Sequence, residues 1–135
     1  MRLNPYLTFD GECEAALKFY ERVLGAQVTV KMTYGETPAA EHVPPETHKL
    51  IIHSTMTIGD QQLMAADAVP GTYAEPKGVY IALHINGFGD AKRTFGALAE
   101  GGKVEMGFEK TFWAAGFGQC VDRFGIPWMI NCEQE

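Results

Sequence analysis

The chain has 135 residues, of which 46% are hydrophobic and 11% aromatic, and its formal net charge at pH 7 is −6. This composition excludes a disordered chain, and the negative charge with scattered basic residues argues against binding to nucleic acid or to an anionic membrane surface. The length suits one ordinary domain, or two small units that share a core.

The first half of the chain predicts a strand, a helix and three more strands. Alternating and β-branched residues predict strands over 3–9, 27–34, 50–58 and 62–67, and apolar residues at helical spacing predict a helix over 12–24. Gly25 is a helix stop, and Gly59-Asp60 is a hairpin turn. We expect 35–49, with its prolines and histidines, to be a loop and 69–78 to be a linker.

The second half predicts the same order of elements, with strands over 79–86, 103–108, 112–122 and 126–132 and a helix over 89–100. An offset of 76 places Gly11 on Gly87, Ala15 on Ala91, Phe19 on Phe95, Gly25 on Gly101 and Val28 on Val104. Five matches in one register indicate a duplication. We therefore predict an α+β fold in one domain, 1–135, built from two tandem βαβββ modules over 1–68 and 79–135.

Two stretches carry a resemblance to a known family. The helical segment Ala15–Gly25 has the sequence AALKFYERVLG, and the segment Thr111–Asn131 has the sequence TFWAAGFGQCVDRFGIPWMIN. On these stretches the chain resembles the PhnB-like branch of the glyoxalase/bleomycin-resistance/extradiol dioxygenase superfamily, also called the vicinal oxygen chelate (VOC) superfamily. The resemblance implies strongly curved sheets that enclose a cavity, helices on the convex side, and pairing of modules in a homodimer.

The resemblance also implies where a metal would be held. Enzymes of the superfamily use His or Glu from the first and fourth strands of both modules to bind a divalent ion. The matching positions here are Asn4, Met64, Tyr80 and Met129, none of which is a good ligand for such an ion. We therefore expect no metal and no cofactor.

Alternation along the strands predicts which side chains face the cavity. Leu7 and Phe9 suit the helix side, so Tyr6 and Thr8 face the cavity, and the offset of 76 carries this face to Tyr80, Ala82 and His84. The expected ligand-binding residues are Tyr6, Thr8, His53, Met64, Tyr80, His84, Phe117 and Met129.

Four histidines allow different interpretations. His42 and His48 lie in the predicted loop and are most simply solvated. His53 and His84 are either half-buried histidines with a hydrogen-bond partner or catalytic candidates, because their ordinary pKa is close to neutral. We expect metal-free binding of a small organic molecule, planar or moderately apolar. The alternative is a glyoxalase- or dioxygenase-like enzyme with a non-standard metal site or a His-based acid/base site.

The remaining signals are largely negative. Cys13, Cys120 and Cys132 have no CxxC spacing and are expected to be buried, reduced thiols. Neither a leader nor a membrane-spanning run is recognisable, so we expect a cytoplasmic protein. Some PhnB-like sequences carry a label as ubiquinone-pathway methyltransferases, but the chain has no Gly-rich loop between a strand and a helix to support it.

Overall fold

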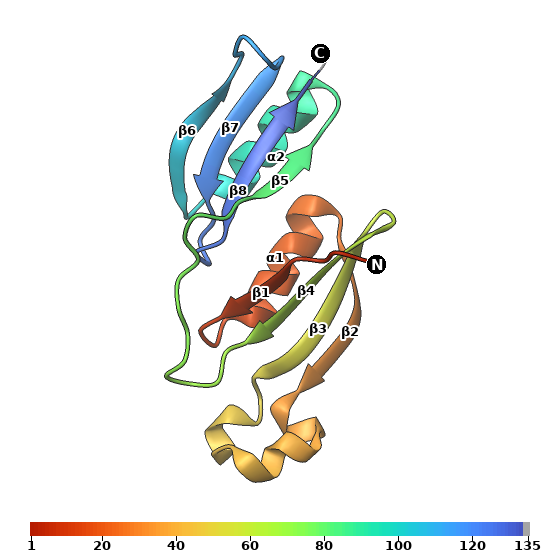
Figure 1. The fold of residues 1–135 in the computed structure, drawn as a ribbon, viewed down its shortest axis with the longest axis vertical. Helices are drawn as coiled ribbons and strands as arrows, with labels where there is room; N and C mark the ends of the chain where they lie inside the picture. The colour runs from red at the N-terminus through yellow and green to blue at the C-terminus, as the bar shows by residue number, and fades with distance from the viewer. Residues whose placement is uncertain (134–135) are drawn as a thin grey trace. The chain divides into compact units, whose positions relative to one another are not determined.

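The computed structural model describes residues 1–133, and the chain divides into two compact units, Met1–Ala74 and a second that begins at Glu75. Each unit is a four-stranded sheet with one helix packed on one face (Figure 1). The sheets are curved but not closed, and the α+β fold of two βαβββ modules is confirmed. Residues 134–135 of the predicted second module lie outside the described residues.

The first unit has a sheet of order β1-β4-β3-β2, in which β1 runs parallel to β4 and the other neighbours are antiparallel. Its elements are β1 (Tyr6–Phe9), α1 (Cys13–Leu24), β2 (Gln27–Thr33), β3 (Ile51–Ile58) and β4 (Gln61–Asp67). The predicted loop between β2 and β3 contains three short 3₁₀ helices, η1 (Tyr34–Glu36), η2 (Pro38–His42) and η3 (Pro45–Thr47).

The second unit repeats this topology with the order β5-β8-β7-β6, again with one parallel pair, β5 and β8. Its elements are β5 (Ile81–His84), α2 (Phe88–Ala99), β6 (Lys103–Glu109), β7 (Gly116–Val121) and β8 (Pro127–Cys132). The strand predicted from residue 112 begins only at Gly116, because 111–114 form a turn in which the Thr111 amide donates to the Ala114 carbonyl at 3.1 Å.

The duplication extends to the register of the strands. Across the first sheet, Tyr6 pairs with Met64, Met64 with Thr55, and Thr55 with Val30. Across the second, the same places are taken by Ala82, Met129, Gln119 and Met106. Both sheets also have a bulge one residue before this row, between Val28 and Val30 and between Val104 and Met106.

The helices correct one part of the predicted alignment. Ala16 and Ala91 are both fully buried at 0% exposure, whereas Ala15 is exposed. The two twelve-residue helices are therefore related by an offset of 75 rather than 76. The match of Ala15 with Ala91 was wrong because one residue separates Gly11 from the start of α1, whereas Gly87 directly precedes α2.

A buried aspartate ties each unit together. The Asp67 carboxylate at the end of β4 accepts backbone hydrogen bonds from Cys13 and Ile51, both at 2.9 Å, and so joins the start of α1 to β3. Asp122 follows β7 and accepts from the amides of Phe124 (2.8 Å) and Ile126 (3.0 Å), within the last hairpin. Its other oxygen accepts from the buried Trp128 indole at 2.8 Å. Both oxygens of Asp122 are therefore hydrogen-bonded, which offsets the cost of burying a carboxylate.

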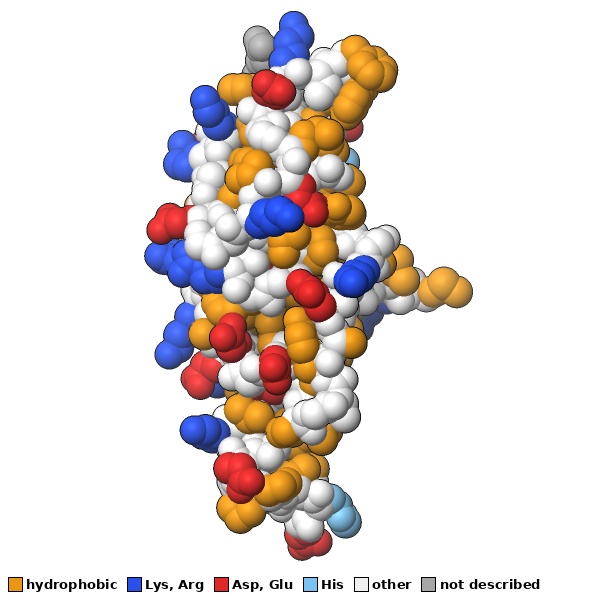
Figure 2. Space-filling model, turned by 90° about the vertical axis from the view of Figure 1, so that its left-hand side faces the viewer, with side chains coloured by type: hydrophobic (Ala, Val, Ile, Leu, Met, Phe, Trp, Pro, Cys, Tyr) orange, Lys and Arg blue, Asp and Glu red, His pale blue; other side chains and the backbone are white. Residues whose placement is uncertain are grey.

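The surface shows no block of one charge over the face seen in Figure 2, where acidic and basic side chains are interspersed with hydrophobic ones. Within residues 1–133, no helix is long and apolar enough to cross a membrane. The histidine His48, expected to be solvated, is half-buried, and its Nε2 lies 2.9 Å from the carbonyl oxygen of Ala40. The three cysteines are buried thiols without disulfides.

Candidate functional site

The face of each sheet that carries no helix is called here its open face. In β1, Phe9 is 1% exposed against the helix, whereas Tyr6 is 46% exposed on the other side. Alternation therefore places Tyr6 and Thr8 on the open face of the first unit, with Met64 beside Tyr6 in the parallel ladder. His53 lies on the same face because its ring contacts Tyr6 directly.

Tyr6 and His53 form a polar pair on this open face. The Tyr6 hydroxyl lies 3.0 Å from His53 Nδ1, and the two rings stack with centroids 5.8 Å apart. The pair joins β1 to β3 across β4, and His53 Nε2 lies 3.5 Å from the Thr55 hydroxyl. Partial burial raises the pKa of Tyr6, so the phenol keeps a proton that it can donate to His53 Nδ1.

The open face of the second unit carries different side chains at the same places. His84 and Phe117 both pair with Asn131 of β8, so these three form one row across the sheet. His84 Nδ1 lies 3.4 Å from the Asn131 side-chain nitrogen. Phe117 meets Trp113 edge to face, with centroids 5.4 Å apart. In this register Ala82 stands where the first unit has Tyr6, so no phenol reaches a histidine here.

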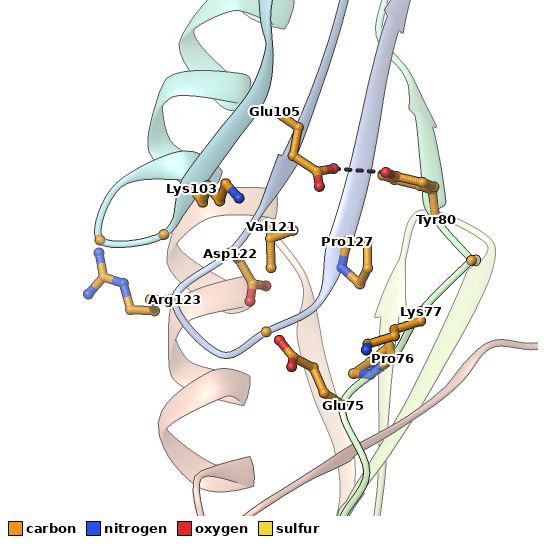
Figure 3. Close-up of a pocket in the computed structure, with 14 residues that line it drawn as sticks. Glu75, Pro76, Lys77, Tyr80, Lys103, Glu105, Val121, Asp122, Arg123 and Pro127 are labelled. Atoms are coloured by element: carbon orange, nitrogen blue, oxygen red, sulfur yellow. Dashed lines mark hydrogen bonds between the residues drawn. The ribbon is translucent and has the colours of Figure 1, made fainter.

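A second polar pair, Tyr80 with Glu105, lies in this unit (Figure 3). The Tyr80 hydroxyl donates to Glu105 Oε1 at 2.8 Å, and this hydrogen bond raises the pKa of Tyr80. Tyr80 directly precedes β5 and Glu105 belongs to β6, which are the two edge strands of the sheet. The side chains of Tyr80 and Glu105 have to span β8 and β7 to meet. They can do so because the sheet curves and brings its two edges closer together.

Sequence reasoning missed Glu105. It lies at the bulge between Val104 and Met106, and a bulge turns a side chain away from the direction that strict alternation gives it. Thr29 has the equivalent position in the first unit, where its hydroxyl donates to the Thr55 carbonyl at 3.4 Å. Val28 and Val104, already matched in the sequence, flank the two bulges, but nothing in the sequence marks a bulge there.

A pocket of about 510 Å³ adjoins the Tyr80–Glu105 pair. Its polar lining comes from Glu75, Lys77, Tyr80, Lys103, Glu105, Asp122 and Arg123. In Figure 3, Lys103 and Arg123 lie on one side of the pocket, and Tyr80 and Lys77 on the other. The volume falls in the range of pockets that hold small organic molecules.

The side chains at the family's metal positions do not fit a metal. Asn4, Met64, Tyr80 and Met129 offer an amide, two thioethers and a phenol that already donates to Glu105. Throughout the described part of the chain, no three His, Cys, Asp or Glu side chains gather where they could share an ion. Burial raises the pKa of the Cys13 thiol to about 12 and that of the Cys120 thiol to about 11, so these two thiols are not activated as nucleophiles.

Comparison with protein families identifies the superfamily of this fold. The model of the Glyoxalase/Bleomycin resistance protein/Dioxygenase superfamily matches residues 2–130. The chain belongs to this superfamily. Protein YjdN of Escherichia coli K12 is 40% identical over 141 residues, which cover 97% of this chain and 95% of YjdN.

Solved structures of the superfamily resemble the chain over its whole length. The crystal structure of protein PA1353 from Pseudomonas aeruginosa has 40% identity and a TM-score of 0.91, covering 100% of this chain and 99% of PA1353. A PhnB protein from Bacillus cereus, described as a putative 3-demethylubiquinone-9 3-methyltransferase, shares the fold with a TM-score of 0.83 at 21% identity, covering 98% and 99%. The resemblance to PhnB-like members is thereby supported at the level of the fold.

The structure brings the predicted site residues together in two groups. Tyr6, Thr8, His53 and Met64 share the open face of the first unit, and Tyr80, His84, Phe117 and Met129 that of the second. Their binding of a ligand remains a prediction. His53 is half-buried and has Tyr6 as its hydrogen-bond partner, as one of the two interpretations expects, whereas His84 contacts Asn131 but is exposed.

Proposed function

We propose that the protein binds a small organic molecule on the open faces of its sheets without a metal ion. The observation that carries this proposal is the replacement of all four metal positions by non-ligand side chains, while a polar pair, Tyr6–His53, stands beside one of them, Met64. The family places its substrate chemistry at this part of the fold. The proposed ligand-binding residues are Tyr6, Thr8, His53 and Met64 in one unit and Tyr80, His84, Phe117 and Met129 in the other.

The Tyr6–His53 pair suits a planar ligand that carries a polar group. Two stacked rings offer a flat surface, and the imidazole offers a hydrogen-bond donor or acceptor at Nε2. Met64 lies beside Tyr6, and Met32, which is 38% exposed, pairs with His53 in the ladder. Thioether side chains adapt to apolar surfaces of different shape.

The absence of a metal requirement is tested on protein purified without a histidine tag. Elemental analysis is expected to find substoichiometric Zn, Ni, Mn and Fe, and addition of each ion is expected to leave the melting temperature unchanged. Stoichiometric, tightly bound metal would overturn the proposal. The test is independent of the ligand's identity, because a bound ion stabilises the native state whatever the substrate is.

The binding face is tested with a library of planar heteroaromatic probes and NMR of the folded protein. Probes that bind are expected to shift the resonances of Tyr6 and His53. His53→Ala is expected to lower the affinity for these probes about fivefold, as for loss of a hydrogen bond worth ~1 kcal/mol. The matched control is His42→Ala, an exposed histidine in η2. An equal loss in both variants would contradict the proposed site.

One observation favours an enzyme as the second candidate. The 3.0 Å contact of the Tyr6 hydroxyl with His53 Nδ1 fixes the imidazole so that Nε2 is available for proton transfer. An acid/base enzyme predicts turnover that is lost in His53→Gln although ligand binding persists. A binding protein predicts that no turnover is found and that the same variant changes affinity alone.

The methyltransferase name of the Bacillus cereus protein does not carry over to this chain. Gly101 and Gly102 lie between α2 and β6, where a helix ends, and Gly116 and Gly118 lie in β7 against the rings of Phe108 and Phe95. A nucleotide cofactor would need a glycine-rich turn between a strand and the start of a helix.

We also propose that the protein is a homodimer, as the family resemblance implies. The support in this chain is the exposure of large apolar side chains on the open faces, including Val30 at 40% and Met106 at 43%. Such surfaces are rare on monomers unless a partner or ligand covers them. Sedimentation at micromolar concentration is expected to give a dimer, and Met106→Glu to weaken it relative to the control Lys92→Glu on α2. A clean wild-type monomer would contradict this proposal.

A further inference from the structure

The pocket of the second unit has charge of both signs on its walls. It lies where the segment before β5 approaches the turn after α2 and the turn after β7. Its cationic side chains are Lys77, Lys103 and Arg123, and its anionic side chains are Glu75 and Glu105 (Figure 3). Asp122 also lines it, but that carboxylate already accepts three hydrogen bonds within the last hairpin.

Some charged groups of the pocket are available to bind a ligand. Within residues 1–133, the ammonium groups of Lys77 and Lys103 take part in no hydrogen bond or ion pair. Glu105 accepts the Tyr80 hydrogen bond at Oε1, and its Oε2 accepts none from the described residues. Arg123 is held in place by donating from Nε to the Glu100 carbonyl at 3.1 Å. The pocket therefore offers ammonium donors and one carboxylate oxygen to a ligand.

Charge of both signs limits what the pocket can take. A ligand with several negative charges would meet Glu75 and Glu105, and one with several positive charges would meet Lys77, Lys103 and Arg123. Juxtaposed like charges weaken binding in either case. A small molecule that carries one charge of each sign, close together, meets favourable charge at both ends.

We propose that this pocket binds a small zwitterion of the amino-carboxylate class, with its ammonium at Glu105 and its carboxylate at Lys103. This pocket shares only Tyr80 with the ligand-binding residues proposed above for the second unit, and the inference rests on the proposed function in that the ligand is a small molecule. Lys103 and Glu105 are two residues apart on β6, which is about 6–7 Å along a strand. An ammonium and a carboxylate on one carbon therefore reach both side chains at once.

Tyr80 is the positioning residue of this site. Its hydroxyl holds Glu105 Oε1 at 2.8 Å and so keeps Oε2 turned to the pocket. Beside it, Val121 and Pro127 give the pocket an apolar wall for the rest of the ligand. In a regular strand residues 104 and 106 would share one face, whereas the bulge puts Val104 opposite the buried Cys120 and Met106 opposite Gln119, with Glu105 between them.

Three probes with the same ring test the ligand class: L-phenylalanine, 3-phenylpropionate, which lacks the ammonium, and 2-phenylethylamine, which lacks the carboxylate. NMR titration of the full chain is expected to give L-phenylalanine at least about fivefold tighter binding than either analogue, the ratio for one exposed charge pair. The shifted resonances are expected to include Tyr80, Lys103 and Glu105.

Variants separate the two charges. Glu105→Gln is expected to make L-phenylalanine no tighter than 3-phenylpropionate, and Lys103→Gln to weaken both carboxylates but not the amine. Lys92→Gln, an exposed lysine on α2, is the control and is expected to change nothing. Tyr80→Phe is expected to bind L-phenylalanine more weakly than the wild type does. Wild-type affinity in this variant would show that the hydroxyl has no positioning role.

Two outcomes overturn the inference. Equal affinity of the three probes, or no binding of any of them at millimolar concentration, would exclude a zwitterion site. Neither outcome affects the binding of planar probes at Tyr6 and His53. A failure of the proposed function is therefore a separate result, and a stoichiometrically bound metal ion would reveal it.

Discussion

The open faces of the two units have the same backbone register and different chemistry. In the first, Tyr6 reaches His53 across one strand, which gives a hydrogen-bonded pair of aromatic rings. In the second, Ala82 stands in place of that tyrosine, and the polar pair is instead Tyr80 with Glu105 beside a charged pocket. A duplicated fold has thus kept its strand pairing while its two sites diverged, because a ladder of backbone hydrogen bonds is indifferent to the side chains on its open face.

The largest expected effect tests what holds each unit together. Asp122→Ala removes the acceptor of two amides and one indole, and is expected to lower the free energy of unfolding by about 3 kcal/mol. Asp67→Ala removes the acceptor of two amides and is expected to cost about 2 kcal/mol. Urea unfolding measures both, with the exposed Asp60→Ala as control. A smaller loss for Asp122→Ala than for Asp67→Ala would contradict this ranking.

The next effect tests a position where the two units differ by one methyl group. A Cβ at Gly102 would collide with the Val121 carbonyl oxygen, so Gly102→Ala is expected to destabilise the protein by about 2 kcal/mol. Ala26 has the equivalent place in the first unit and is buried at 5% exposure. Gly96→Ala on α2, with open space around it, is the control and is expected to stabilise by about 0.5–1 kcal/mol. Thermal unfolding distinguishes the signs.

A smaller effect is expected for the polar pair of the first unit. Tyr6→Phe removes one hydrogen bond on a partly exposed face, so the free energy of unfolding is expected to fall by only about 0.5 kcal/mol. The His53 tautomer is the more sensitive measurement, since Nδ1 loses its donor. Nitrogen NMR of the imidazoles is expected to change for His53 and not for His84. A change in both would mean that the variant disturbs the fold.

The polar pair of the second unit is tested by titration. The Glu105 carboxylate raises the pKa of Tyr80 above its ordinary 10.0, so the folded state holds the phenol proton more tightly than the unfolded state. This contribution to stability is present below pH 10 and is lost as the pH rises through the raised pKa. Ultraviolet titration of the phenolates is expected to show Tyr80 ionising at lower pH in Glu105→Gln, whereas Tyr6 and Tyr34, raised chiefly by burial, stay where they are.

Some of the candidate site followed from the sequence and some did not. Alternation in β1 and the repeat placed Tyr6, Thr8 and His84 on the open faces, since the pleat is a local property of a strand. The partner of Tyr6 could not be predicted in the same way, because His53 is 47 residues away and meets it only through the strand order β1-β4-β3. Glu105 was missed because its direction depends on a bulge.

The amino-acid sequence by itself determined the order of elements, the duplication and the lack of metal ligands at Asn4, Met64, Tyr80 and Met129, because periodicity, turn residues and side-chain chemistry are local. The tertiary structure alone decided which side chains meet. It set the one-residue shift of the helices, the Tyr6–His53 and Tyr80–Glu105 pairs and the charged pocket, since these depend on how far each sheet bends and on where its ladder slips by one residue.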